Sequence, residues 1–163
     1  MDEGRKAVFL DRDGVINRER GEHTWRPEDF DILPGVPEAV KALRDAGWLV
    51  IVISNQSGVG LGLYAIDDVE RLHGYLHDRL GNAPIDAVYY CPHHPSQGRC
   101  LCRKPAGLLL ERAIARFGID PARSVMIGDR DRDLQAARSV GVRGVLVQAN
   151  EALLPVLQNE GIL

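Results

Sequence analysis

The sequence has 163 residues, of which 45% are hydrophobic and 26% charged, and its formal net charge is −3. This length suits one hydrophobic core, so we expect a single domain over residues 1–163. The charge excludes a strong attraction to nucleic acid or anionic lipid. The longest apolar run, Trp48 to Ile53, is too short to cross a bilayer, and the start of the chain lacks an export signal. We therefore expect a cytoplasmic protein that binds neither nucleic acid nor a membrane.

Short, continuous apolar runs rich in Val, Ile and aromatic residues are typical of strands buried on both faces. They predict strands at 7–10, 48–53, 87–90, 125–127 and 145–147. Amphipathic patterns predict helices at 37–46, 67–80, 106–117, 131–140 and 152–159. The alternation predicts a three-layer α/β fold with a mostly parallel sheet and right-handed crossovers. Ligands of such folds bind at the carboxyl ends of the strands.

Acidic side chains follow two of these strands. The first strand runs into Asp11 and Asp13, and the fourth into Asp129. Residues i and i+2 of an extended segment point to the same side, so the first two acids can face one pocket. Three converging carboxylates repel one another unless a cation is present, and hard oxygen ligands suit Mg²⁺. Magnesium in turn favours a phosphate substrate, because it reduces the repulsion between a carboxylate and a phosphoryl group.

The remaining polar groups at the same edge also suit phosphate. The second strand leads into SNQSGVG (residues 54–60), which offers the Ser54 hydroxyl and backbone N–H groups. The basic pair Arg103 and Lys104 precedes the third helix, and Lys104 can hold a phosphoryl oxygen. A carboxylate can act as the nucleophile and form an aspartyl-phosphate.

Each motif has an ordinary structural explanation when it is taken alone. DRDG (residues 11–14) commonly forms a solvated turn, SNQSG a loop, and GDRDRD (residues 128–133) a charged helix start. Their joint placement at the ends of predicted strands favours an active site.

All three cysteines lie in the segment CPHHPSQGRCLC (residues 91–102). Cys91, Cys100 and Cys102 with one histidine supply four ligands suited to a closed, structural zinc site. This chemistry leaves His93 and His94 open as the fourth ligand. The alternative is a set of buried free cysteines beside a chance histidine. A zinc site here would fix the loop that carries Arg103 and Lys104.

In the motifs FLDRDGVIN, SNQSG, YYCPHHP, CLCRKP and IGDRDRD, taken in this order, the sequence resembles the haloacid dehalogenase-like phosphatases. Within them it is similar to the bacterial D,D-heptose 1,7-bisphosphate phosphatases, with the histidinol-phosphate phosphatases as close relatives. The resemblance covers nearly the whole chain. It implies a Rossmann-like core without a full cap domain, a monomer, and a small phosphorylated metabolite as substrate, in carbohydrate metabolism that supplies lipopolysaccharide precursors.

The resemblance also implies roles for single residues. Asp11 would be the nucleophile, and Asp13 the acid that protonates the leaving oxygen and then the base that activates water. Mg²⁺ would be held by Asp11, the backbone carbonyl of Asp13, and Asp129, while Ser54 and Lys104 steady the phosphoryl group. The family's zinc pattern falls on Cys91, His93, Cys100 and Cys102. The substrate-binding residues would be Glu19, Arg20, Gly21, Glu22, Asn55, Gln56, Ser57, Arg103 and Arg130.

The sequence departs from the heptose enzymes in two places. Glu22 stands where those enzymes usually carry a tyrosine, and the segment ERGEHTW (residues 19–25) is one residue longer before Phe30. The gap between His93 and Cys100 is short, which is nearer the histidinol-phosphate type. We expect a heptose 1,7-bisphosphate 7-phosphatase, with histidinol phosphate as the alternative substrate.

Two further classes of protein fit the sequence less well. A zinc-ribbon binding module would need a basic face with exposed aromatics, whereas the chain has 20 basic and 23 acidic residues and only 6% aromatics. A phosphate-binding protein without turnover would not need the complete set of Asp11, Asp13, Lys104 and Asp129.

Overall fold

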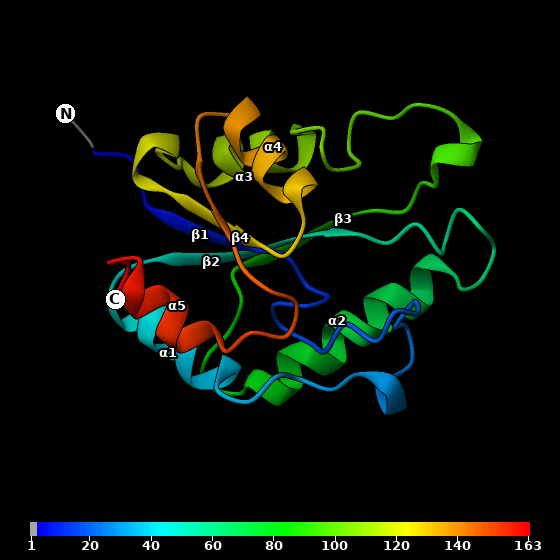
Figure 1. Cartoon of the computed structure of the whole chain (residues 1–163), viewed down its shortest axis with the longest axis horizontal. Helices are drawn as coiled ribbons and strands as arrows, with labels where there is room; N and C mark the ends of the chain where they lie inside the picture. The colour runs from blue at the N-terminus through cyan, green and yellow to red at the C-terminus, as the bar shows by residue number, and fades with distance from the viewer. Residues whose placement is uncertain (1–2) are drawn as a thin grey trace.

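The computed structural model describes residues 3–163, and within them five parallel strands form one sheet in the order β3-β2-β1-β4-β5 (Figure 1). The strands are β1 (Ala7–Leu10), β2 (Leu49–Asn55), β3 (Ala87–Cys91), β4 (Val125–Gly128) and β5 (Arg143–Leu146). The predicted parallel α/β sheet is confirmed. After β1, the chain adds β2 and then β3 on one side of β1. It then crosses over and adds β4 and β5 on the other side, so the direction of strand addition reverses at β1.

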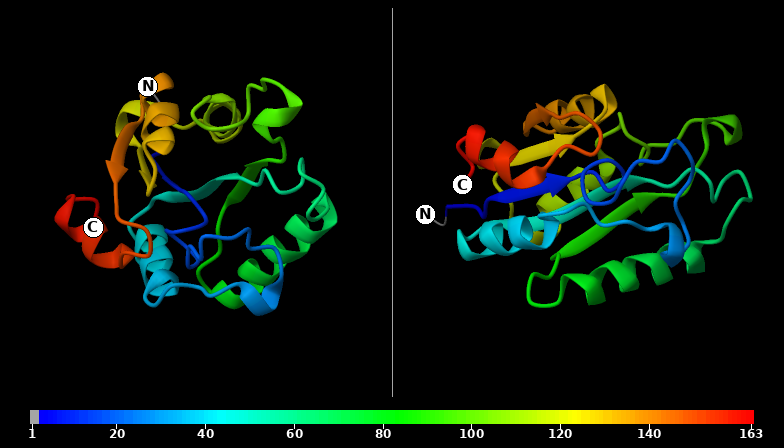
Figure 2. Two further views of the ribbon diagram at one scale, coloured as in Figure 1. Left: turned by 45° about the vertical axis from the view of Figure 1, so that its right-hand side comes forward. Right: turned by 60° about the horizontal axis from the view of Figure 1, so that its bottom comes forward.

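Helices cover both faces of the sheet (Figures 1 and 2). The helices are α1 (Val36–Asp45), α2 (Ile66–Leu80), α3 (Leu108–Phe117), α4 (Asp131–Ser139) and α5 (Leu153–Asn159). In Figure 1, α3 and α4 lie above the sheet, and α1, α2 and α5 lie below it. This is the predicted three-layer arrangement, with helix ends within two residues of those expected from the sequence.

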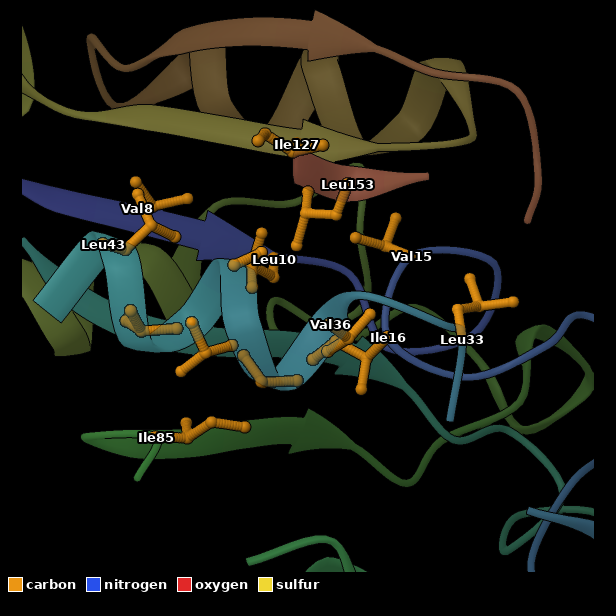
Figure 3. Close-up of a cluster of buried hydrophobic side chains, with 14 of the residues drawn as sticks. Val8, Leu10, Val15, Ile16, Leu33, Val36, Leu43, Ile85, Ile127 and Leu153 are labelled. Carbon is orange, nitrogen blue, oxygen red and sulfur yellow. The ribbon is translucent and has the colours of Figure 1, made fainter. Parts of the chain in front are cut away.

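Two hydrophobic clusters fill the spaces between the layers. On the side of α1, α2 and α5, the sheet contributes Val8 and Leu10 of β1 (Figure 3). Phe9, between them in the strand, packs on the opposite side with α3 and α4. Full burial of an aliphatic or aromatic side chain stabilises the fold by roughly 1.5–3 kcal/mol. The central strand therefore holds both layers together.

The two edge strands differ from the prediction of strands buried on both faces. β5 begins at Arg143, two residues before the apolar run at 145–147, and Leu146 is 58% exposed. Val147 lies outside the strand. β3, at the other edge, is half-buried over most of its length. Each of these strands has a neighbour on one side only, so the helices cover it incompletely.

The register of β1 brings distant parts of the chain together. Leu10 pairs with Val52 of β2 and with Ile127 of β4. The backbone N–H of Asp11 then donates to the Ile127 carbonyl at 3.0 Å. The residues that follow β1 and β4 therefore meet at one edge of the sheet. Within residues 3–163, none of the helices has the length and apolar character that crossing a membrane requires.

Candidate active site

Three carboxylates meet where β1 and β4 end. Asp11 follows β1, Asp129 follows β4, and Asp133 lies in the first turn of α4. Each offers one oxygen within 4.8 Å of the others. The sequence prediction named the first two and missed Asp133. The signal was present, because Asp133 falls in the first turn of the helix predicted at 131–140, directly after the strand end that carries Asp129.

The surroundings of Asp129 suit a hard cation. Both of its carboxylate oxygens are buried and lack a hydrogen-bond partner among residues 3–163. Burial and the negative charge of Asp11 raise the pKa of Asp129 to about 7. Gly14 has φ +91°, and a Cβ there would lie 2.4 Å from Asp129 Oδ2. Buried carboxylate oxygens without donors, in a space kept open by a glycine, fit the coordination preference of Mg²⁺.

Lys104 lies beneath this carboxylate cluster. Its side chain is 1% exposed, and Nζ contacts Asp11 Oδ1 at 2.8 Å and Asp133 Oδ1 at 2.7 Å. Nζ also donates to the Ile53 carbonyl at 2.7 Å. Burial acts to lower the pKa of Lys104, but the two carboxylates outweigh it and raise the pKa. The ammonium group therefore stays charged and stabilises two of the three acids.

A two-way hydrogen bond fixes the loop that carries Lys104. The Asn55 side chain, at the end of β2, accepts from the Lys104 N–H at 3.0 Å and donates to the Lys104 carbonyl at 3.1 Å. Asn55 therefore acts on the backbone of Lys104 and also lines the cavity described below.

Asp13 is held apart from the three-carboxylate cluster. Its Oδ1 accepts from Arg12 Nη2 at 2.9 Å and Asn17 Nδ2 at 3.0 Å, and its Oδ2 accepts from Gln56 Nε2 at 3.2 Å. Burial acts to raise the pKa of Asp13, but the charge and hydrogen bonds of Arg12 outweigh it and lower the pKa. Asp13 thus differs in environment from Asp129.

The orientation of Gln56 follows from its neighbours. Tyr64 donates to Gln56 Oε1 at 2.9 Å, so the amide nitrogen faces Asp13 and also donates to Ser54 Oγ at 2.8 Å. Ser54 is fully buried. Its hydroxyl lies under the cavity and helps to fix Gln56.

A cavity of about 260 Å³ opens in front of these groups. This size suits a small molecule. Eleven of the site residues named from the sequence line it: Asp11, Asp13, Glu19, Gly21, Glu22, Asn55, Gln56, Ser57, Arg103, Asp129 and Arg130. The sequence analysis missed three further lining residues: His23, Thr24 and Arg132.

Three predicted site residues do not belong to this lining. Ser54 and Lys104 are buried beneath it. The Arg20 guanidinium lies 3.2 Å from Glu22 and 3.7 Å from Asp29. Glu22 itself lines the cavity, so Arg20 lies next to the lining, and its contact with the substrate stays a prediction.

A second cluster lies in the loop after β3. Cys91, His93, Cys100 and Cys102 offer ligand atoms within 4.8 Å of one another. His93 Nδ1 is 3.2 Å from Cys102 Sγ and 3.5 Å from Cys91 Sγ. The His94 ring instead interacts with Ser96, at 2.8 Å from its hydroxyl. Three thiols and one imidazole nitrogen are a suitable ligand set for tetrahedral zinc.

The fold and the carboxylate site define the class of the haloacid dehalogenase-like hydrolases. A family model for HAD-hydrolase-like proteins matches residues 101–157. The chain is 39% identical over 159 residues to the D-glycero-beta-D-manno-heptose-1,7-bisphosphate 7-phosphatase of Haemophilus ducreyi. The aligned region covers 92% of this chain and 87% of the relative. It is 44% identical over 156 residues to the D-glycero-D-manno-heptose-1,7-bisphosphate 7-phosphatase of Thermosynechococcus vestitus. That alignment covers 88% of this chain and 79% of the relative.

A solved structure of the same family is also similar to this chain. The D,D-heptose 1,7-bisphosphate phosphatase from B. bronchiseptica, complexed with magnesium and phosphate, matches with a TM-score of 0.83 and 34% identity. The match covers 95% of this chain and 86% of that one. The chain belongs to the D,D-heptose 1,7-bisphosphate phosphatase family of the haloacid dehalogenase-like hydrolases.

Proposed function

We propose that this protein is a Mg²⁺-dependent phosphatase that removes the 7-phosphate of D-glycero-D-manno-heptose 1,7-bisphosphate. The observation that carries the proposal is the junction of Asp11, Asp129 and Asp133 over Lys104 at the carboxyl ends of β1 and β4. The names of the relatives supply the substrate.

In the proposed reaction an Asp11 carboxylate oxygen attacks phosphorus, and the bond between phosphorus and the sugar oxygen breaks. Asp13 donates a proton to the leaving sugar oxygen. It then takes a proton from a water molecule, whose oxygen attacks the aspartyl-phosphate, and phosphate leaves with Asp11 restored. The donors around Asp13 favour its charged form. A bound phosphate dianion acts in the opposite direction and raises the pKa of Asp13, which prepares it to donate.

Mg²⁺ would be held by Asp11, Asp129 and the backbone carbonyl of Asp13, with Asp133 beside them. When bound, it supplies positive charge that reduces the repulsion between the Asp11 carboxylate and the phosphoryl group. Lys104 keeps Asp11 in place from below, through its 2.8 Å contact with Oδ1. Ser54 and Gln56 hold the neighbouring side of the phosphate site through their mutual hydrogen bond.

Zn²⁺ would be a structural ion on Cys91, His93, Cys100 and Cys102. Cys91 ends β3, and Cys102 comes two residues before Lys104. A closed four-ligand site would fix the loop that leads into Lys104. It would support catalysis by holding Arg103 in the cavity lining and Lys104 in contact with Asp11.

The substrate would lie against Glu19, Gly21, Glu22, Asn55, Gln56, Ser57, Arg103 and Arg130. A specific observation favours histidinol phosphate as the second candidate. Glu19 and Glu22 line the cavity, and a carboxylate there can pair with an amine. The three arginines Arg103, Arg130 and Arg132 line the cavity as well and favour the substrate with two phosphates. The cytoplasmic location and the monomeric state stay predictions.

The test is phosphate release by the purified protein with Mg²⁺, with heptose 1,7-bisphosphate and histidinol phosphate compared side by side. We expect a preference for the bisphosphate. Asp11→Asn should lower kcat by at least about a thousandfold while phosphate still binds, because the amide is not a nucleophile. The matched control is Asp131→Asn, at an exposed carboxylate of α4. Wild-type turnover in Asp11→Asn would exclude the aspartyl-phosphate mechanism.

A further inference from the structure

Arg12 lies between the two catalytic aspartates in the sequence, yet it is 1% exposed. Its Nη2 donates to Asp13 Oδ1 at 2.9 Å and to the Thr24 carbonyl at 2.7 Å. Its Nη1 lies 3.3 Å from His73 Nε2, and the guanidinium stacks over the Phe30 ring at 5.6 Å. One buried cation therefore contacts both the proposed acid/base and the backbone of the segment that lines the cavity.

That segment, residues 19–25, is here called the rim segment, and its other end is held by Asn150. The Asn150 side chain accepts from the Glu19 N–H at 2.7 Å and donates to the Glu19 carbonyl at 3.3 Å. Its own N–H donates to the Gly14 carbonyl at 2.8 Å. Asn150 has φ +69°, a conformation that asparagine tolerates better than most residues.

We propose that Arg12 is a positioning residue that couples the rim segment to the Asp13 carboxylate, and that Asn150 holds the opposite end of the same segment. A sugar that settles against the rim segment then acts through Thr24 and Arg12 on the group that protonates its leaving oxygen. The inference rests on the proposed function, because it needs Asp13 as the acid.

The chemistry of arginine supports this role over a purely stabilising one. Burying a guanidinium has a large desolvation cost, and a buried ion pair is weak evidence for net stability. Among the described residues, Asp13 is the one carboxylate that Arg12 contacts. A planar fork of donors can hold a carboxylate and a carbonyl at fixed angles, which the single ammonium of lysine cannot do.

The test compares two substrates with different leaving groups. p-Nitrophenyl phosphate releases a stable phenolate that needs little help from an acid, whereas a sugar phosphate releases an alkoxide that needs a proton. Arg12→Lys should lower kcat for heptose 1,7-bisphosphate at least about tenfold more than kcat for p-nitrophenyl phosphate, and should raise KM for the sugar. Asn150→Gly tolerates the positive φ and does not touch Asp13, so it should raise KM for the sugar with kcat retained.

The same substitution at an exposed site, Arg112→Lys on α3, serves as the control and should leave both substrates unaffected. Equal losses on the two substrates in Arg12→Lys would overturn the inference, because a loss of folded protein lowers both rates by one factor. If Arg12→Lys does not fold, Asn150→Gly still decides, since an unchanged KM for the sugar contradicts the positioning of the rim segment. Absence of turnover of the bisphosphate by the wild type would instead contradict the proposed function.

Discussion

At the scale of single residues, the pKa of Asp129 makes a prediction about the metal-free protein. Burial and the charge of Asp11 raise this pKa from its usual 3.8 to about 7. A carboxyl group whose pKa is raised on folding favours the folded state in its protonated form. Its contribution is fully present below the unfolded pKa and is lost as the pH rises through about 7.

Asp129→Asn should therefore raise the Tm of the metal-free protein more at about pH 8, where Asp129 is ionised in the folded and unfolded states, than at about pH 5, where it is ionised only in the unfolded state. Thermal unfolding in a chelator measures this. Asp131→Asn, whose side chain is 69% exposed, should show no such pH dependence. With added Mg²⁺ at about pH 8, the Tm of the wild type should exceed that of Asp129→Asn, since the wild type has the intact ligand set. An equal shift at both pH values would contradict the assignment.

The sequence predicted the acids and missed the residues that orient them. Asp11, Asp13 and Asp129 follow apolar strands, so their placement could be derived from a pattern. Nothing local shows that Arg12 is buried, because an arginine between two aspartates is typical of a solvated turn. Its partners Thr24 and His73 come from distant segments. Such contacts depend on tertiary packing.

At the scale of elements, we expect the conformation of the loop after β3 to depend on the proposed zinc ion. The four ligand atoms cluster although the loop contains only one short helical turn, Pro95–Gln97. Burial raises the pKa of the Cys91 thiol, so without a metal that thiol stays protonated. A cation would favour the thiolates and fix the loop. Loss of zinc should then displace Arg103 and Lys104 from their positions in the active site.

His93→Ala should remove most of about one zinc ion per chain and lower kcat by about 10- to 100-fold, while His94→Ala should retain both. The difference follows from geometry, because the His93 ring faces the thiols and the His94 ring faces Ser96. Metal analysis of the purified variants, with activity measured on the same samples, gives the answer. Zinc loss in His94→Ala alone would show that the other histidine is the ligand.

Sequence patterns predicted the elements unequally. Helix α1 was predicted within one residue, because its apolar stripe and the following Gly47 mark its face and its end. β5 was misplaced by two residues at its start, because an edge strand carries exposed residues such as Arg143 that break the apolar run. β2 was missed by two residues at its end, because the polar residues Ser54 and Asn55 continue the strand beyond the apolar run. Apolar runs therefore locate a strand, but polar residues at its ends hide its boundaries.

At the scale of the whole molecule, both layers of helices share one sheet and should unfold together. Leu43 of α1 and Leu110 of α3 are fully buried in opposite clusters. Leu43→Ala and Leu110→Ala should each lower the free energy of unfolding by about 2–5 kcal/mol with the same dependence on urea. Leu63→Ala, at a side chain that is 53% exposed, should change it by less than about 0.5 kcal/mol. Separate transitions for the two layers would contradict a single cooperative unit.

The pairing of β1 with β4 has a consequence for synthesis on the ribosome. β1 holds residues 7–10 and β4 holds residues 125–128, so most of the chain must emerge before the two can pair. Until then Asp11 has neither Asp129 nor Asp133 beside it, so the three carboxylates do not repel one another in the growing chain. Contacts this far apart in sequence form late and slowly. The site is thus assembled at the end of folding, and a nascent chain that stops before residue 125 has no means of turning over a phosphate.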